Sequence, residues 1–334
     1  MAGYAASTTR RGLLPLVALA VSAPRLAQAF PERAITFATG YAPGGGTDVA
    51  ARILADRMAV HLGPGTRIVV ENRPGAAGAI ASEWLTRQPP DGHTLMITET
   101  GAALAAPVAV IGGTRYEPIE DFTHLGFISR PPAVLIVTPA LAAATPREML
   151  ARLRAMRPGS TTYASSGFGG MIHMWGEMVS QRLGLQSVHV PYRSGAQMIQ
   201  AIMTGEAQYG VSSMASAATM MREGKVRPVA LVGDHRYSPF PEIPTMGELG
   251  ETGFETGSLF MLVGPPRMAE PVAAAINAAL LKTLSEPAVG ERLLFVGLDP
   301  ARAPNGLTDA REEMMQQLAR MRAIVEQTGI RVQP

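Results

Sequence analysis

The chain has 334 residues, of which 47% are hydrophobic and 17% charged, and it contains no cysteine. This is the composition of a globular protein large enough for two hydrophobic cores. It excludes a disulfide framework and metal sites built on thiolates, and a formal charge of +2 without any basic run gives no support to nucleic acid binding.

Residues 1–29 have the layout of a signal peptide. Arg10 and Arg11 precede an apolar run from residue 12 to about residue 23, and Ala27-Gln28-Ala29 offers a small-x-small cleavage site. The run is shorter than the roughly 20 residues that span a bilayer. The arginine pair resembles a twin-arginine export signal, but an ordinary secretory signal tolerates the same pair, so both export routes stay open. We therefore expect an exported protein, with a formal charge of about −1 once the three arginines of this segment are removed.

From residue 30 onwards, short apolar segments rich in β-branched residues alternate with stretches of helical periodicity. This alternation predicts an α/β fold, and the chain is too long for one ordinary sheet, so we expect two α/β domains with a cleft between them. The predicted strands are residues 34–39, 67–71, 94–98, 134–138, 161–164, 187–191, 208–212, 226–232 and 258–263.

Three helices can be placed from their apolar stripes and end signals. The first begins near Asp48, ends at Gly63-Pro64 and has an apolar stripe made of Val49, Ile53, Leu54, Met58 and Leu62. A capping box, Thr145-Pro146-Arg147-Glu148, starts a second helix that runs through Met156. The last helix, residues 308–328, has one stripe that predicts packing on a domain, made of Met314, Leu318, Met321, Ile324 and Val325.

The loop from Gly40 to Thr47 joins the first strand to the first helix. It nearly fits the phosphate-binding pattern G-x-x-x-x-G-K-[ST], but Gly46 stands where the lysine is needed, and no G-x-G-x-x-G follows the strand. Glycines let backbone N–H groups approach a ligand, and the helix start adds its positive dipole end. The loop therefore predicts a site for a carboxylate, with a tight turn that binds nothing as the alternative.

A second loop repeats this plan. Ser165-Ser166-Gly167-Phe168-Gly169-Gly170 follows a strand and leads into a helix with His173 in or near its first turn. A third strand-to-helix junction, residues 191–196, has Ser194 as a helix N-cap and Tyr192 as a candidate to line the cleft. If the first two loops face each other, they can hold two negative groups or the two ends of one small dianion.

The sequence gives little support to catalysis. It has no G-x-S-x-G, no thiol nucleophile and no H-E-x-x-H spacing among its six histidines. We expect neither an enzyme nor a bound cofactor or metal.

Five segments in order resemble the Bug-type solute-binding proteins of tripartite tricarboxylate transporters. They are "FPERAITFATGYAPGGGTDVAARILADRM", "VVENRPGAAGAIASEWLTRQPPDGHTLMI", "YASSGFGGMIHMWGE", "HVPYRSGAQMIQAIMTGEAQ" and "GKVRPVALVG". The resemblance implies a type II periplasmic binding protein that is not an enzyme, closes on a small organic acid like a clamp and delivers it to membrane subunits of a transporter. It implies a first domain of residues 30–128 plus 250–334 and a second of residues 129–249. We expect a monomer.

The resemblance also implies the ligand-binding residues. In the first loop these are Tyr41, Ala42, Pro43, Gly44, Gly45, Gly46, Thr47 and Asp48, and in the second they are Ser165, Ser166, Gly167, Phe168, Gly169, Gly170 and His173. Asp48 fits a helix-stabilising acid better than a ligand contact, and His173 either contacts the ligand or orients its loop. Arg73, in the family-typical segment 72–75, fits a structural role better than a ligand role.

The chain departs from the family pattern at several pocket positions. Glu99, beside Thr100, would repel a dianion and could pair with an ammonium group, whereas Ser212 stands where the family often has an aspartate. Phe168, Gly170 and Met171 replace residues that are commonly polar, and Leu259 replaces an aromatic residue. A more apolar pocket follows, which suits a monocarboxylate, an aromatic compound or an amino acid at least as well as a tricarboxylate. A periplasmic sensor with a membrane signalling partner would use the same clamp and stays an alternative.

Overall fold

The computed structural model describes residues 1–3, 30–233, 236–252, 254, 258–301, 304–329 and 331. The predicted signal peptide falls on residues 1–29, of which residues 4–29 lie outside the described residues. Within the described ranges, no helix combines the length and the apolar character needed to cross a bilayer.

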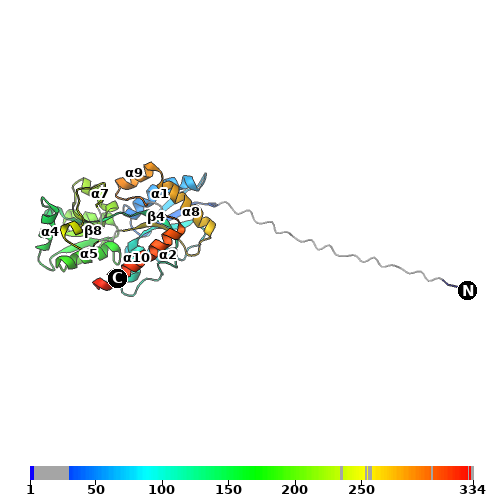
Figure 1. The fold of residues 1–334 in the computed structure, drawn as a ribbon, viewed down its shortest axis with the longest axis horizontal. Coiled ribbons are helices and arrows are strands. Elements are labelled where there is room, and N and C mark those ends of the chain that lie inside the picture. Colours follow the sequence, from blue (N-terminus) through cyan, green and yellow to red (C-terminus); the bar gives the residue numbers. More distant parts are fainter. Residues whose placement is uncertain are drawn as a thin grey trace.

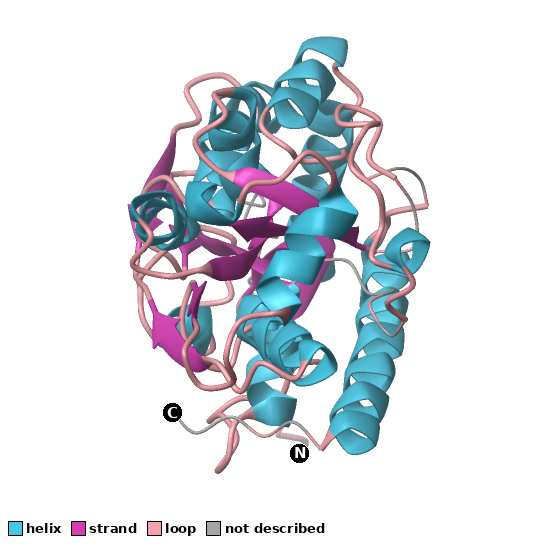
Figure 2. Ribbon diagram, turned by 90° about the vertical axis from the view of Figure 1, so that its left-hand side faces the viewer, coloured by secondary structure: helices cyan, strands magenta, loops and turns pink. Residues whose placement is uncertain are grey.

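Two five-stranded mixed sheets form the framework, and each has helices on its faces (Figures 1 and 2). The first sheet has the order β2-β1-β3-β10-β4, with β10 antiparallel to both of its neighbours. Its strands are β1 Ile35–Thr39, β2 Ile68–Asn72, β3 Thr94–Glu99, β4 Thr123–Ser129 and β10 Phe260–Gly264. We call this sheet with its helices the first lobe.

The second sheet has the order β7-β6-β8-β5-β9, with β5 antiparallel to β8 and β9. Its strands are β5 Ala133–Val137, β6 Thr162–Ser165, β7 Val188–Pro191, β8 Tyr209–Ser213 and β9 Arg227–Val232. This sheet with its helices is the second lobe. The chain passes to this lobe between β4 and β5 and returns to the first lobe between β9 and β10. Each sheet therefore has one strand, β10 or β5, that runs antiparallel to the strands beside it.

The helices connect these strands and cover both sheets. They are α1 Gly46–Leu62, α2 Ala79–Leu85, α3 Ala106–Ala109, α4 Pro146–Arg154, α5 Met171–Leu183, α6 Gly195–Thr204, α7 Met214–Arg222, α8 Glu270–Leu284, α9 Pro287–Phe295 and α10 Leu307–Thr328. Short 3-10 turns lie at Ala76–Gly78, Pro139–Leu141 and Gly247–Leu249, and a π-helical turn lies at Gly101–Ala105. Figure 1 shows α4, α5 and α7 in one lobe and α1, α2 and α8 in the other.

All nine predicted strands are present, displaced by no more than two residues at either end. The strand β4 is not predicted from the sequence, because Gly126 interrupts its apolar run. Gly126 has a φ of +136°, and a β-carbon there would lie 2.8 Å from Leu280 Cδ2 on α8. The strand therefore needs a glycine at this point to let α8 pack closely on it.

The predicted helix ends are close to the observed ones. The first helix begins at Gly46, and its stripe packs on the first sheet, with Ile53, Leu54 and Met58 buried. The capping box at α4 is present in part: the Thr145 hydroxyl accepts from the Glu148 N–H, but the Glu148 carboxylate accepts from the Ala144 N–H. The helix ends at Arg154 rather than at Met156.

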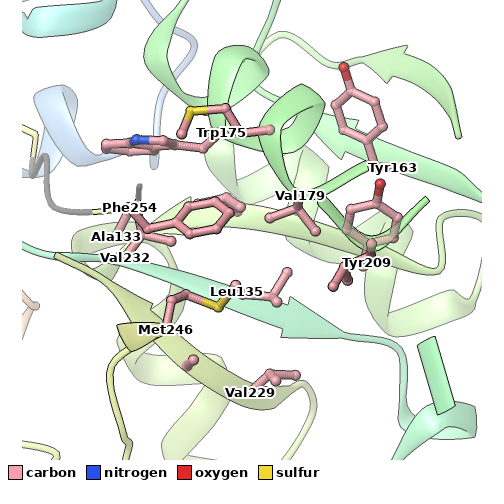
Figure 3. Packing of buried hydrophobic residues seen from close by; sticks show 14 of the residues in the cluster. Ala133, Leu135, Tyr163, Trp175, Val179, Tyr209, Val229, Val232, Met246 and Phe254 are labelled. Atoms are coloured by element: carbon pink, nitrogen blue, oxygen red, sulfur yellow. The ribbon is translucent and has the colours of Figure 1, made fainter. Parts of the chain in front are cut away.

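The last helix joins the two lobes. Near its start, α10 places Ala310, Met314 and Leu318 in a buried cluster of the first lobe. Towards its end, Met321 and Val325 lie in the core of the second lobe. Figure 3 shows part of that core, with Trp175 and Phe254 close to Ala133 and Val232 of the sheet. The expectation that this helix packs on one domain is incomplete, because its buried stripe is shared between two cores.

Candidate ligand-binding cleft

A cavity lies between the two lobes. Its volume, including the part open to solvent, is about 410 Å³. It is lined by Tyr41, Gly45, Gly46, Thr47, Glu99, Ser166, Ile172, Gly195, Met198, Ser212, Ser213, Ser216, Ser258 and Phe260. These residues come from both sheets and from the helices that follow their strands, so a ligand held here touches both lobes.

Three helices begin at this cavity. Gly46 is the first residue of α1, Gly195 is the first residue of α6, and Ser213 is the N-cap of α7. At α1 and α7 no side chain caps the first N–H groups. Because helix N-termini carry unpaired N–H donors and the positive end of the helix dipole, their convergence favours an anion.

Many of the residues that line the cavity have hydroxyl groups, and none of the lining residues is an arginine, a lysine or a histidine. Thr47 is 2% exposed, and its hydroxyl has no hydrogen-bond partner among the described residues. A buried polar group without a partner costs free energy, so this hydroxyl is free to bind a ligand. Ser166, Ser212, Ser213, Ser216 and Ser258 supply further hydroxyls, and Ile172, Met198 and Phe260 supply apolar surface.

Tyr41 and Glu99 form the floor of the cavity on the first lobe. The Tyr41 hydroxyl lies 2.8 Å from the Ala77 carbonyl oxygen and 2.5 Å from Glu99 Oε1. Glu99 Oε2 accepts from the Gly101 N–H at 2.7 Å. Burial raises the pKa of Glu99, while the hydrogen bonds from Tyr41 and the backbone oppose that rise. Among the residues that the structure describes, no cationic side chain contacts the Glu99 carboxyl.

The two lobes are in contact around the cavity. The Ala42 N–H donates to the Arg193 carbonyl oxygen across the cleft at 3.3 Å. A β-carbon at Gly46 would lie 2.9 Å from Phe260 Cζ and 3.1 Å from Ala215 Cβ of α7, and one at Gly167 would lie 2.9 Å from the Ala77 nitrogen. Glycine at these two points therefore permits the close approach of the lobes.

Asp48 shapes the first loop from behind. Its carboxylate accepts from the Gly44 N–H at 2.9 Å and from Asn72 at 3.0 Å, and it forms an ion pair with Arg52 at 2.9 Å. Burial opposes ionisation of Asp48, but the hydrogen bonds from Arg52, Gly44 and Asn72 lower its pKa. Its oxygens are all engaged within the chain, and it does not line the cavity.

In the second loop, two of the predicted site residues, Ser165 and His173, form hydrogen bonds with the backbone of the loop itself. His173 Nδ1 accepts from the Gly169 N–H at 3.1 Å, and the ring stacks on His189 at 3.7 Å between centroids. The Ser165 hydroxyl lies 2.6 Å from His189 Nε2 and accepts from the Gly167 N–H. These contacts orient the loop, which was one of the two roles weighed for His173.

An outer chamber adjoins the cavity and shares Tyr41 and Ser166 with it. Its other lining residues are Gly40, Pro74, Gly75, Ala76, Ala77, Gly167, Phe168, Pro191, Tyr192 and Arg193. Tyr192 donates its hydroxyl to Glu206, which together with burial raises the pKa of Tyr192 to about 12. Arg73 does not line it, since its guanidinium pairs with Glu71 and stacks 3.8 Å over the Trp84 ring.

The predicted site residues thus divide into three groups. Those that line the cavity are Tyr41, Gly45, Gly46, Thr47, Glu99, Ser166 and Ser212. Those that line the outer chamber alone are Gly167, Phe168 and Tyr192. Those that line neither are Ala42, Pro43, Gly44, Asp48, Thr100, Ser165, Gly169, Gly170 and His173.

Seven lining residues are not among those predicted from the sequence: Ile172, Gly195, Met198, Ser213, Ser216, Ser258 and Phe260. The strand-to-helix junctions after β7 and β8 contain a sequence pattern that could have indicated some of these residues. Ser213 and Ser216 lie at the start of a helix that directly follows a strand, the same arrangement that drew attention to the first loop. Among the residues that the structure describes, no group of three or more His, Cys, Asp or Glu side chains is placed to hold a metal ion.

The fold and the cleft together define a two-domain type II periplasmic binding protein. Residues 50–330 match the sequence profile of the tripartite tricarboxylate transporter family receptor, TctC. The chain belongs to this family of solute-binding proteins. Protein BugT of Bordetella pertussis is 28% identical over 312 residues, which cover 93% of this chain and 94% of BugT.

Solved structures agree with this membership. The periplasmic binding protein BugD is 25% identical, with a TM-score of 0.84 over 91% of this chain and 100% of that one. MatC of Rhodopseudomonas palustris, solved with bound malate, is 27% identical, with a TM-score of 0.83 over 89% of this chain and 100% of that one. A second R. palustris protein, solved with adipate, is 27% identical, with a TM-score of 0.83 over 90% and 99%.

Proposed function

We propose that this chain captures a small organic acid in the cleft between its lobes and delivers it to a tripartite tricarboxylate-type transporter. The observation that carries the proposal is the convergence of three helix N-termini on a cavity where the Thr47 hydroxyl is buried without a partner. Malate and adipate, held by two similar proteins, are carboxylates. A site of this kind replaces the water around a carboxylate with fixed N–H and hydroxyl donors.

The mode of action follows from the contacts between the lobes. The Ala42 to Arg193 hydrogen bond is the contact of a closed state, and a ligand touching both lobes favours that state over an open one. The predicted domain bounds, residues 30–128 plus 250–334 and residues 129–249, place the cleft between the two domains. Membrane subunits of the transporter are the expected partners, and the exported chain works as a monomer in the periplasm.

Titration calorimetry with malate and adipate tests the proposal. We expect saturable binding of at least one of them, and no binding of the matching diamides, which keep the shape but lack the charge. Bound ligand should also raise the melting temperature, because stabilisation reaches about 2.7 kcal/mol at a hundred times the dissociation constant. Binding of the diamides in preference to the acids would contradict the proposal.

A further inference from the structure

The oxygen atoms around Tyr41 require more protons than the tyrosine can supply. The Tyr41 hydroxyl has one hydrogen, yet its oxygen lies 2.8 Å from the Ala77 carbonyl oxygen and 2.5 Å from Glu99 Oε1. If Glu99 were a carboxylate, both neighbours would be acceptors, and one of these short oxygen contacts would have no hydrogen in it. A hydrogen on Glu99 Oε1 resolves this, because Glu99 then donates to Tyr41 and Tyr41 donates to Ala77.

The two oxygens of Glu99 have different surroundings, which suit the carbonyl oxygen and the hydroxyl oxygen of a carboxylic acid. Oε2 accepts from the Gly101 N–H at 2.7 Å and lies 3.4 Å from the Ser258 hydroxyl, as a carbonyl oxygen would. Oε1 has one amide, that of Ala102, at 3.3 Å, and it has the short contact to Tyr41. A carboxyl whose two oxygens differ in this way can carry its proton at Oε1 without losing any bond at Oε2.

In the described part of the chain, no cationic side chain contacts Glu99 to hold it ionised. The titratable groups that face it are the hydroxyls of Tyr41 and Tyr116, and burial raises the pKa of both. From β10 it faces Ser258, and Phe260 is its partner in the strand register. From the second lobe the start of α5 approaches through the Met171 amide, close to Gly101. Burial raises the pKa of Glu99 itself.

We propose that Glu99 is a neutral carboxylic acid in the closed cleft, and that the chain binds an organic anion only while this proton is present. The inference rests on the proposed function and sharpens its ligand class. With the proton in place, the cavity carries no formal charge, and helix N-termini and hydroxyls bind the anion. Without it, a carboxylate would lie in the same small cavity as the ligand and repel it. The ligand is thus an anion rather than a compound that brings an ammonium group to Glu99.

The proton balance is simple. The proton on Glu99 comes from solvent and returns to solvent when the cleft opens at a pH above the pKa of Glu99. By linkage, a bound anion raises this pKa further, and an ionised Glu99 lowers the affinity for the anion. The affinity is therefore constant at low pH and falls by up to about tenfold per pH unit once the pH exceeds the pKa of the ligand-free chain.

The first experiment needs no ligand. Infrared difference spectra of the wild-type chain against Glu99→Gln at neutral pH should show the C=O stretch of a protonated carboxylic acid. The exposed Glu312→Gln on α10 is the matched control and should show carboxylate bands only. Tyr41→Phe should shift the carboxylic acid band, because it removes the hydroxyl that accepts the proton. Carbon-13 NMR of the glutamate carboxyl groups in the wild-type chain gives the same information without a variant. Absence of a protonated glutamate in both spectra at neutral pH overturns the inference.

The second experiment measures malate and adipate affinity from about pH 6.5 to about pH 9, where both acids stay fully ionised. The wild-type affinity should fall with rising pH, and that of Glu99→Gln should stay flat over the same range. An affinity that is flat in the wild type across a pH range in which the infrared band shows Glu99 losing its proton overturns the coupling. If neither acid binds while the protonated carboxyl is observed, the proposed function fails and the protonation of Glu99 stands. If the acids bind and no protonated carboxyl is found, the proposed function stands and this inference fails.

Discussion

The two glycine-rich loops have the same sequence plan but different contacts. In the first lobe, residues 40–48 place Gly45, Gly46 and Thr47 on the cavity, while Asp48 holds the loop from behind. In the second lobe, residues 165–173 place Ser166 and the apolar Ile172 on the cavity, and His173 binds the loop's own backbone. The pattern of a strand, a run of small residues and a helix therefore predicts a possible site. The side-chain contacts determine whether such a loop itself lines the site or stabilises its own backbone beside it.

The second lobe contributes to the cavity mainly through its other two junctions. Gly195 at the start of α6 and Ser212, Ser213 and Ser216 around the start of α7 face the first loop. The comparison leads to four predictions, in which changes in the first loop alter affinity and changes in the second alter stability.

The largest effect is expected at Gly45. Its φ of −75° and the ordinary contact distances around a β-carbon there make Gly45→Ala acceptable to the fold. Gly45→Asp instead brings a negative charge to the N-terminus of α1, and we expect it to weaken organic acid binding by at least about 100-fold, because a buried like charge costs several kcal/mol. Calorimetry and melting curves of both variants check this; equal affinities for Asp and Ala would count against the first loop. Gly46 is less suitable, since any side chain there meets Phe260 and Ala215.

Thr47→Val should give the next largest effect. Valine keeps the shape of threonine but lacks the hydroxyl, which has no partner among the described residues. We expect about a 10-fold loss of affinity for an organic acid, as for one hydrogen bond to a charged group. The melting temperature of the ligand-free chain should stay the same or rise, and a clear fall would show that the hydroxyl stabilises the fold instead.

His173→Phe is the counterpart in the second loop. Phenylalanine keeps the ring that stacks on His189 but removes the Nδ1 acceptor of the buried Gly169 N–H. An unpaired buried N–H costs about 1–3 kcal/mol, so denaturant unfolding should show a loss of that size. Affinity, measured well below the melting temperature, should change much less than in Thr47→Val; the reverse order would mean that His173 contacts the ligand.

The smallest expected effect is the response of the second loop to acid. Burial and the neighbouring His173 lower the pKa of His189 to about 3, whereas an unfolded histidine titrates near 6.5. Between these values the unfolded chain binds a proton that the folded chain refuses, so the stability from His189 is complete above about pH 6.5 and is lost as the pH falls. The melting temperature of the wild type should therefore drop more steeply between pH 6.5 and pH 4 than that of His189→Gln. Parallel curves would contradict the assignment.

Sequence patterns were sufficient where local rules set the structure. The strands alternate with helices that have clear end signals, and α1 and α10 start within two residues of their predicted positions. Sequence patterns failed where contacts between distant segments determine the structure. Gly126 is needed for the close approach of α8 to β4, and the buried stripe of α10 is divided between two cores.

The same division holds at the site. The position of Gly45 and Gly46 at the cavity could be predicted, because glycines between a strand and a helix start leave the backbone N–H groups accessible. For Asp48 the sequence favoured a structural role and for His173 it left two roles open, but it could not name their partners, which are Asn72, Arg52 and the Gly169 N–H. Ser258 and Phe260 lie on β10, and only the return of the chain to the first sheet brings them to the cavity.

The central claim is that the first loop and the junctions of the second lobe hold a carboxylate between them. A crystal structure of the chain with malate or adipate bound tests it most directly. We predict one carboxylate within hydrogen-bond distance of the Thr47 hydroxyl and the first N–H groups of α1, with α6 or α7 on its other side. A ligand held only in the outer chamber beside Arg193, with the Thr47 hydroxyl still unpaired, would contradict the account.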